Sequence, residues 1–372
     1  MMRIGFDAKR AFFNKSGLGN YSRDTISILT GNYTEHSYSL YTPPGIPKVN
    51  FKTDSSVSIC KPTSYVGKKL PFFWRSFLLP NQLKSDRIDL FHGLSNEIPF
   101  NIKNSGIKSV VTIHDLIFLR FPEWYPFIDR KIYEVKFRRS CRDADRIIAI
   151  SKQTKNDIIE FFGIDPDKID VVYQGCNPAF QKKAYTEQVS MIREKYSIPD
   201  EYLLYVGTVE KRKNLLTIIK ALKISNLNIP LVIVGRHTSY TGQVKNYIRN
   251  KNMKNILFIK HVDTNELPVF YQNAKIFIYP SIFEGFGIPI QEALFSKTPV
   301  ITSKAGCFHE SGGPASIYID PENAEDFADA ILKLLKDTSF REKVVSEGYA
   351  YAQNFTNEKI AKNLMEVYKK IV

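Results

Sequence analysis

Short apolar runs alternate with longer segments of helical periodicity along the whole chain, and this alternation limits the possible folds more than any other feature. Most of the runs are rich in valine, isoleucine and tyrosine, which is typical of buried parallel strands. In the first half they span residues 3–8, 37–42, 56–60, 88–93, 108–115, 145–151 and 169–175. In the second half they span residues 202–207, 230–235, 256–262, 275–281, 298–303 and 316–320. The repeated strand–helix pattern over 372 residues predicts an α/β protein with two doubly wound parallel-sheet domains.

Helix signals lie between these runs. Ser151 is suited to cap the helix that follows it, and Gly163 would end that helix. Asp263 and Glu266 predict a second capped helix start. The boundary between the domains is expected within 175–188, where glycine, proline and polar residues follow the last strand of the first half.

The composition is that of an ordinary globular protein, with 43% hydrophobic and 24% charged residues. It excludes a mainly disordered chain, a coiled coil and a collagen-like fibre. Without a run of about 18 apolar residues or the apolar segment of a signal peptide, we expect neither a membrane span nor a signal sequence. The 4 cysteines have no C-x-x-C spacing, so we expect reduced thiols in a cytoplasmic protein.

The chain is basic, because 52 lysines and arginines against 38 acidic residues give a net charge of +14. Residues 68–79 and 121–146 combine cations with large apolar side chains, as segments at membrane surfaces do. Helices whose aromatic residues face the core would show the same composition, and both interpretations stay open. No nucleic-acid-binding motif accompanies the charge, so we do not expect nucleic acid as a partner.

The segment 280–293, PSIFEGFGIPIQEA, is the strongest candidate for chemistry, because it joins a strand to a helix. Gly287 allows close approach of a ligand, and Pro289 suits a first helical turn whose free N–H groups attract anions. A glycosidase pair of carboxylates lies about 5–9.5 Å apart, whereas eight helical residues advance about 12 Å. The spacing of Glu284 and Glu292 therefore favours two contacts with one extended ligand; a surface turn and an amphipathic helix are the alternative.

A second candidate follows the strand that ends at Gly207. Lys211, Arg212 and Lys213 stand where a helix begins near Asn214. Cations at this end oppose the helix dipole, and they are unfavourable unless an anion lies between them. A diphosphate would be such an anion, with arginine as a fork and lysine as a point charge. The alternative is a loop with solvated cations.

Two weaker candidates lie in the first half. Gly17 and Gly19 precede a helix, but Ser22 takes the third glycine position of the dinucleotide-binding fingerprint, and a plain turn is an equal interpretation. His114 and Asp115 end a strand where a ligand cleft is expected, and His92 holds a similar place with less weight. A structural histidine is the alternative.

Together these motifs resemble a known family. The segments GFDAKR, SGLGNYSRD, TIHDLIFLRFPEWY, ADRIIAIS, YVGTVEKRKN and EGFGIPIQEA are similar to those of family 4 of the retaining GT-B glycosyltransferases, the "group 1" transferases. They are most similar to the mannosyltransferase-like branch that builds bacterial surface polysaccharides. The resemblance covers nearly the whole chain and keeps the order of the motifs.

The resemblance implies the GT-B fold, in which two Rossmann-like domains face a central cleft. It implies an N-terminal, acceptor-side domain of residues 1–178 and a nucleotide-sugar-binding domain of residues 179–355. It also implies that residues 356–372 form a last helix that crosses back to the first domain.

The resemblance assigns roles to residues at matching positions. Arg212 and Lys213 would hold the donor diphosphate, and Glu292 would accept hydrogen bonds from the ribose. Glu284 would contact the transferred sugar. Further donor contacts would come from Gly17, Gly19, Phe286, Gly287 and Ile288, and the base would lie against Arg236, His261 and Val262. His114 would sit near the sugar and the acceptor.

The sequence departs from the family pattern in two places. Thr208 stands where many members have arginine, so Arg212 and Lys213 would carry the phosphates alone. Phe308, His309 and Glu310 replace the usual leucine-proline-glutamate segment, which leaves the role of Glu310 open.

The implied reaction moves a hexose from a nucleotide sugar to a saccharide or lipid-linked saccharide, with retention and without a metal or other cofactor. GDP-mannose is the first choice of donor and a UDP-sugar the second. A peripheral location on the inner face of an anionic membrane is expected from residues 68–79 and 121–146. Two alternatives stay open, a nucleotide-sugar epimerase and a non-catalytic nucleotide-sugar-binding or scaffold protein of the same fold.

Overall fold

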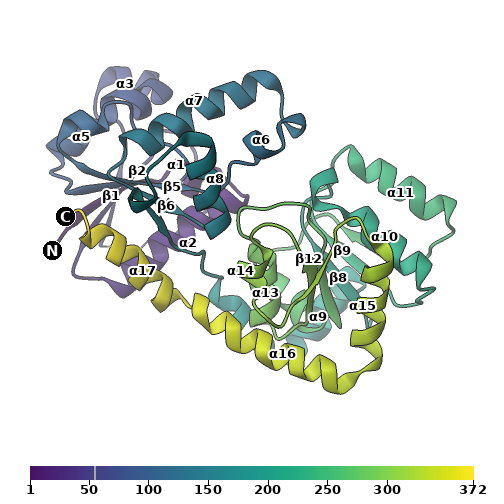
Figure 1. Ribbon diagram of the computed structural model, residues 1–372. Helices are drawn as coiled ribbons and strands as arrows, with labels where there is room; N and C mark the ends of the chain where they lie inside the picture. Colours follow the sequence, from purple (N-terminus) through teal and green to yellow (C-terminus); the bar gives the residue numbers. More distant parts are fainter. Residues whose placement is uncertain (54–55) are drawn as a thin grey trace. The chain divides into compact units, whose positions relative to one another are not determined.

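The computed structural model describes residues 1–53 and 56–372, and the chain separates into two compact units (Figure 1). The N-terminal unit consists of Met1–Gly175 and Phe355–Val372. The C-terminal unit consists of Cys176–Asn354. The chain first passes from one unit to the other between residues 175 and 176, at the start of the range 175–188 expected from the sequence and three residues before the bound of 178 that the resemblance implied. No helix of the described residues is long and apolar enough to span a membrane.

The N-terminal unit is built on a parallel sheet. Its described strands are β1 (Arg3–Asp7), β2 (Ser37–Tyr41), β3 (Val57–Cys60), β4 (Leu90–Gly93), β5 (Lys108–Ile113), β6 (Arg146–Ala149) and β7 (Ile169–Val171). They pair in the order β3-β2-β1-β4-β5-β6-β7, with every pairing parallel. The order reverses between β1 and β4, and ligands of such sheets bind outside the carboxyl ends of the strands at this switch point.

The C-terminal unit repeats the plan. Its strands are β8 (Leu203–Val206), β9 (Leu231–Val234), β10 (Ile256–Ile259), β11 (Ile276–Tyr279), β12 (Val300–Ser303) and β13 (Ile317–Ile319). They pair in parallel in the order β10-β9-β8-β11-β12-β13, so the switch point lies between β8 and β11. Each predicted apolar run contains one of these strands, and the expected pair of doubly wound sheets is confirmed.

Helices connect the strands of the N-terminal unit. They are α1 (Lys9–Phe13), α2 (Gly17–Asn32), α3 (Tyr65–Lys69), α4 (Pro71–Phe73), the π-helix η1 (Trp74–Leu78), α5 (Leu79–Ser85), α6 (Ile117–Arg120), α7 (Phe127–Asp143) and α8 (Lys152–Phe162). Apolar side chains of α5, α7 and α8 pack with those of β4, β5 and β6 into one core. Ser151 caps α8 as predicted, because its hydroxyl accepts a hydrogen bond from the Thr154 N–H, and Gly163 ends the helix with left-handed backbone.

The C-terminal unit has a corresponding set of helices. They are α9 (Thr186–Tyr196), α10 (Leu215–Ile224), α11 (Tyr240–Asn250), α12 (Leu267–Gln272), α13 (Ile288–Phe295), α14 (Phe308–Gly312), α15 (Ala324–Lys336) and α16 (Thr338–Ala352). Helices α10 and α15 pack with β8, β9, β11 and β12 into the second core.

The predicted capped start at Asp263 is wrong. Helix α12 begins at Leu267, and the preceding residues form a turn in which the Glu266 N–H bonds to the Asp263 carbonyl. The Glu266 carboxylate instead accepts hydrogen bonds from Lys195 and Tyr196, both at 2.7 Å. The side chain of Glu266, which the sequence pattern assigned to a helix cap, therefore binds Lys195 and Tyr196 instead.

The last helix, α17 (Asn357–Lys369), belongs to the N-terminal unit and packs on α2 (Figure 1). A buried polar chain fixes it to the sheet. The Tyr368 hydroxyl lies 2.7 Å from Nδ1 of His92 on β4, and Nε2 of His92 lies 2.8 Å from the Thr112 hydroxyl on β5. Thr112 in turn lies 3.0 Å from the hydroxyl of Tyr21 on α2. His92 therefore has the structural role that the sequence left as the alternative.

Burial of His92 makes the stability of the fold depend on pH. Burial, with a small effect of His114, lowers the pKa of His92 to about 3, whereas in the unfolded chain it is about 6.5. As the pH falls, the unfolded state therefore takes up a proton on His92 before the folded state does. The contribution of neutral His92 to stability is fully present above about pH 6.5 and is lost as the pH falls toward 3. We expect His92 alone to remove about 2 kcal/mol of unfolding free energy between pH 7.5 and pH 5.

Chemical denaturation of the wild type and of His92→Gln at both pH values measures this effect. The variant is expected to be less stable at pH 7.5 but to lose less stability on acidification. An equal loss in both proteins would contradict the assignment of a neutral, buried His92.

A buried ion cluster at the carboxyl edge of the C-terminal sheet

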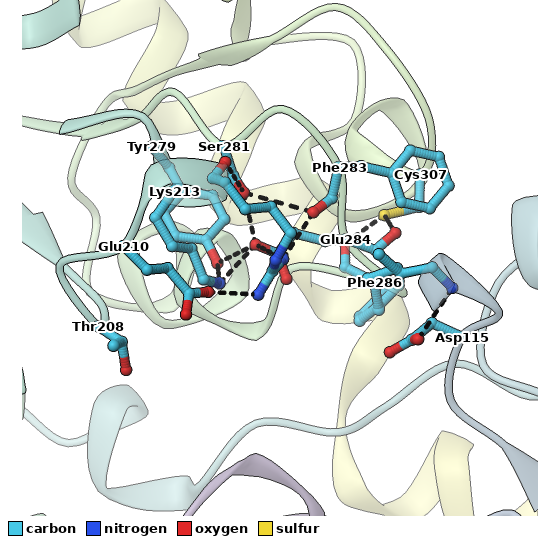
Figure 2. A network of polar contacts seen from close by, with 12 residues as sticks. Asp115, Thr208, Glu210, Lys213, Tyr279, Ser281, Phe283, Glu284, Phe286 and Cys307 are labelled. Carbon is cyan, nitrogen blue, oxygen red and sulfur yellow. Dashed lines mark hydrogen bonds and ion pairs between the residues drawn. The ribbon is translucent and has the colours of Figure 1, made fainter. Parts of the chain in front are cut away.

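The residues of the two strongest motifs meet at the switch point of the C-terminal sheet. Lys211–Lys213 form a 3₁₀ turn in the connection between β8 and α10, and Glu284 lies in the connection between β11 and α13. Strands β8 and β11 are neighbours in the sheet, so their carboxyl ends place the two connections together. Figure 2 shows the resulting polar network.

Backbone hydrogen bonds join the two connections. The Ile282 N–H donates to the Arg212 carbonyl at 2.9 Å. The Arg212 guanidinium donates to the Phe283 carbonyl at 2.7 Å. Asn214, with a left-handed φ of 56°, ends the turn and begins α10. The position of Arg212 is therefore fixed both by its backbone and by its side chain.

Glu284 is the centre of the cluster. Its Oε1 lies 2.7 Å from a guanidinium nitrogen of Arg212 and 2.5 Å from Nζ of Lys213. Hydroxyls of Ser281 and Tyr279 also donate to Oε1, at 2.5 and 3.2 Å. Burial by itself would raise the pKa of Glu284, but Lys213 and Arg212 outweigh burial and lower that pKa to about 2. Glu284 is therefore an anion at every physiological pH.

The cations on either side are not solvated loop residues. The Lys213 and Arg212 side chains are only 13% and 21% exposed, which excludes that alternative, whereas Lys211 is exposed. Burial lowers the pKa of Lys213, and the ion pair with Glu284 opposes this effect. The Lys213 ammonium also donates to the Tyr279 hydroxyl at 2.5 Å, and Arg212 pairs with Glu210 at 2.8 Å. The anion that the sequence required between these cations is present within the protein as Glu284.

Glu292 lies on α13 and has a different partner. Its Oε2 accepts a hydrogen bond from the Tyr271 hydroxyl of α12 at 2.7 Å. Tyr271 is fully buried, and burial followed by the nearby Glu292 charge raises its pKa well above the ordinary value. Tyr271 therefore keeps its proton and acts as a constant donor that orients the Glu292 carboxylate.

The turn before α13 depends on glycine and on a thiol. Gly287 is the N-cap of α13 with φ of 104°, a conformation in which a side chain would be strained. The Cys307 thiol lies 3.1 Å from the Phe286 carbonyl and 3.2 Å from the Glu284 carbonyl. Phe286 is buried and Ile288 is partly exposed. The strand, the turn and α13 thus hold Glu284 and Glu292 on one short segment.

The other residues predicted for the donor follow neighbouring strands at the same edge. Thr208 follows β8, and its carbonyl accepts from the Tyr205 hydroxyl at 3.2 Å. Arg236 follows β9 and is exposed. His261 and Val262 follow β10, where exposed His261 pairs with Asp263 at 3.6 Å. The sheet brings these residues to one edge, but the described ion cluster is formed by Arg212, Lys213 and Glu284.

Gly17, Gly19 and His114 belong to the N-terminal unit. At Gly19 a Cβ would lie 2.0 Å from the Asn14 carbonyl oxygen, so only glycine fits, whereas the space at Gly17 is open. His114 is buried at the carboxyl end of β5, where its Nε2 lies 2.9 Å from the Leu94 carbonyl. Burial lowers the pKa of His114 to about 4, so it is neutral at pH 7.

Three residues of the site were not predicted from the sequence. Tyr279 is the last residue of β11 and Ser281 follows two residues later, so both lie within five residues of Glu284, and this proximity was a usable signal. Tyr271 gave no local signal, because it reaches Glu292 from another helix. Among the described residues, no group of three or more histidine, cysteine, aspartate or glutamate side chains is placed to hold a metal ion.

Comparison with solved structures agrees with this architecture. Anabaena HepE, crystallised with UDP and glucose, superimposes with a TM-score of 0.74 over 100% of both chains at 17% sequence identity. WaaG, a glycosyltransferase of lipopolysaccharide biosynthesis, gives a TM-score of 0.71 over 98% of this chain and 99% of its own at 16% identity. At these identities the likeness establishes the fold.

Sequence comparisons establish the family. The O-antigen chain mannosyltransferase B of Escherichia coli is 26% identical over 99% of this chain and 100% of its own length. The O-antigen chain mannosyltransferase RfbU of Salmonella typhimurium is 31% identical over 60% of each chain. Residues 34–180 match the model of Glycosyltransferase Family 4, and residues 188–351 match that of Glycosyl transferases group 1. The resemblance is confirmed: the chain belongs to the group 1 glycosyltransferases, with a family 4 domain in its N-terminal half.

Proposed function

We propose that the protein transfers a hexose from a nucleotide sugar to a saccharide or lipid-linked saccharide in surface polysaccharide synthesis, with retention at the anomeric carbon. The observation that carries the proposal is the buried cluster of Arg212, Lys213 and Glu284 at the switch point of the C-terminal sheet. Two cations and the adjacent N-terminus of α13 would face the diphosphate, and the carboxylate would face the sugar.

The proposed chemistry needs stabilisation of the leaving group. Negative charge develops on the diphosphate as the glycosidic bond to it breaks. Arg212 and Lys213 are fixed before the reaction by the backbone and by Tyr279, so they would stabilise this charge without reorganisation. In the proposed front-face reaction, the departing phosphate oxygen takes the proton of the acceptor hydroxyl. His114, neutral at pH 7, would offer a hydrogen bond and not a charge near the acceptor.

The donor is proposed from the relatives and from the edge of the sheet. Two relatives are named O-antigen mannosyltransferases, which supports GDP-mannose as the first donor to test. HepE was crystallised with UDP, so UDP-sugars come second. Glu292, oriented by Tyr271, would bind the ribose, and Arg236, His261 and Val262 would line the base. Gly17, Gly19, Thr208, Phe286, Gly287 and Ile288 would complete the donor site.

Lys213 provides the first test. Thermal unfolding is followed with GDP, UDP and their sugar conjugates, and a ligand at 100 times its Kd should add about 2.7 kcal/mol of stability. We expect Lys213→Ala to lose most of this shift. We also expect its turnover to fall about 10²–10³-fold, as for other lost groups that stabilise developing charge.

The matched control for Lys213 is Lys211→Ala, which removes an exposed lysine from the same turn and should behave as the wild type. Near-normal turnover of Lys213→Ala would contradict its assignment. If no nucleotide stabilises the wild type, this result supports a scaffold function over transferase activity. If a nucleotide sugar is isomerised without an acceptor product, the protein is an epimerase.

The reaction course is tested on the product. We expect an α-linked product from an α-configured nucleotide sugar, because retention is proposed. Turnover should be the same in EDTA as with added Mg²⁺, because Arg212 and Lys213 would supply the positive charge that a metal supplies in other transferases. Product NMR and the two rates measure these outcomes. A β-linked product or loss of activity in EDTA would contradict the proposed mechanism.

A membrane surface is proposed as a further partner, because the basic aromatic segments expose several of their apolar side chains. Phe72 is 61% exposed and Ile128 is 70% exposed. Trp74 and Phe137 of these segments are buried, as the interpretation of core-facing aromatic residues requires, whereas Phe72 and Phe127 are exposed and do not fit it. Lys136 of α7 lies over the Phe72 ring, so α4 and α7 present one surface of cations and apolar groups. This surface would contact anionic lipid and bring the protein to a lipid-linked acceptor.

Vesicle sedimentation tests the membrane contact. We expect binding to vesicles that contain phosphatidylglycerol, weaker binding at high salt, and little binding to neutral phosphatidylcholine. Phe72→Ser/Ile128→Ser should weaken binding, because it removes two exposed apolar contacts. Tyr185→Ser/Met191→Ser is the control, since it removes exposed apolar groups from the C-terminal unit. No preference for anionic vesicles, or equal loss in both variants, would contradict the proposed surface.

A further inference from the structure

The two cations proposed to bind the donor diphosphate already share an anionic partner. One oxygen of Glu284 lies within 2.7 Å of both Arg212 and Lys213, and the Glu284 side chain is only 12% exposed. A diphosphate that reaches these cations therefore does not meet an uncompensated positive site. It must share the cations with a carboxylate that stays in place.

Glu284 is held firmly enough to remain there. Ser281 and Tyr279 donate hydrogen bonds to the same oxygen, and Cys307 contacts the backbone carbonyl of Glu284. Protonation does not remove the charge at physiological pH, since the pKa of Glu284 is about 2. The electrostatic repulsion between Glu284 and a bound phosphate is therefore a permanent property of the site.

We infer that Glu284 discriminates between donor and product, by weakening the binding of the nucleoside diphosphate and so speeding its release. The inference rests on the proposed function. In the nucleotide sugar the outer phosphate is bonded to the sugar as an ester and to the inner phosphate as an anhydride, so it carries one negative charge. After transfer it is the terminal phosphate of the nucleoside diphosphate, whose second ionisation has a pKa of about 6 and adds nearly one further charge at pH 7. Glu284 repels the product more strongly for this reason.

The transferred sugar acts in the opposite direction. In the proposed site Glu284 accepts hydrogen bonds from sugar hydroxyls, which the donor offers and the product lacks. One carboxylate thus gives the donor an attractive contact and gives the product only repulsion. A charge about 6 Å from the added phosphate charge, at the effective dielectric near a protein surface, corresponds to a change of about a hundredfold in Kd, which screening by water and salt reduces to about tenfold.

Isothermal titration of the wild type and Glu284→Gln with GDP, GDP-mannose, UDP and UDP-glucose tests the inference. The substitution keeps the shape of the side chain and removes its charge. We expect the nucleoside diphosphate that binds the wild type to bind Glu284→Gln about tenfold more tightly. The corresponding nucleotide sugar should bind no more tightly than to the wild type. The inhibition constant of the nucleoside diphosphate should fall with its Kd.

The chain offers a matched control. Glu210 also pairs with Arg212, at 2.8 Å, but its side chain is 34% exposed and its charge is better screened by water. Glu210→Gln should change the Kd of the nucleoside diphosphate by less than about twofold. If Glu210→Gln tightens binding as much as Glu284→Gln, the effect is one of general charge, and the inference is overturned.

The remaining outcomes separate the inference from the proposed function. Equal or weaker binding of the nucleoside diphosphate to Glu284→Gln, with normal binding to the wild type, overturns the inference alone. No binding of any nucleotide to the wild type overturns the proposed function and the inference together. If Glu284→Gln does not fold, Lys213→Gln is compared with Lys213→Gln/Glu284→Gln, in which one cation and one anion are neutralised together. The double variant is then expected to bind the diphosphate more tightly than the single variant, and the reverse order overturns the inference.

Discussion

The ion cluster around Glu284 is the interaction on which the rest of the C-terminal site depends. Two buried cations in adjacent residues would be very unfavourable without an anion, and the sheet supplies one from the neighbouring strand. The cluster also joins the connection after β8 to the connection after β11. The Arg212 carbonyl accepts from the Ile282 N–H and the Arg212 guanidinium donates to the Phe283 carbonyl, which strengthens this connection. The stability of this edge and the proposed function therefore draw on the same three side chains. Separating buried Glu284 from Arg212 and Lys213 would leave unpaired buried charges, which is energetically unfavourable. This penalty keeps the β8–α10 and β11–α13 connections in one arrangement.

The position of this cluster follows from the topology of the sheet. Parallel strands bring their carboxyl ends to one edge, and the reversal of order between β8 and β11 leaves room there for two connections that diverge. Gly287 then turns the chain into α13, and Tyr271 orients Glu292 from the neighbouring helix. Each motif residue is held by a partner distant in sequence, which is why a short segment suffices to present two glutamates.

The strands and the motif residues could be predicted from the sequence because their signals are local. An apolar run such as 231–234 or a glycine before a helix such as Gly287 requires no knowledge of the partner. Contacts between segments could not be predicted in this way. The sequence predicted that Arg212 and Lys213 bind the anion of a ligand. In the structure their anionic partner is Glu284, which lies 71 residues from Lys213 in the sequence. Asp263 failed as a helix cap for the same reason, since Lys195 and Tyr196 hold the nearby Glu266.

The N-terminal unit is completed by a segment that is synthesised after the C-terminal unit. Residues 355–372 leave the ribosome only after the whole C-terminal unit, yet they carry Tyr368, the partner of buried His92. Domains usually fold in the order of synthesis. In this chain, however, the face of α2 that packs on α17 stays uncovered until the second unit has been made. The N-terminal unit can therefore be finished only after the C-terminal unit has been made, when α17 packs on α2.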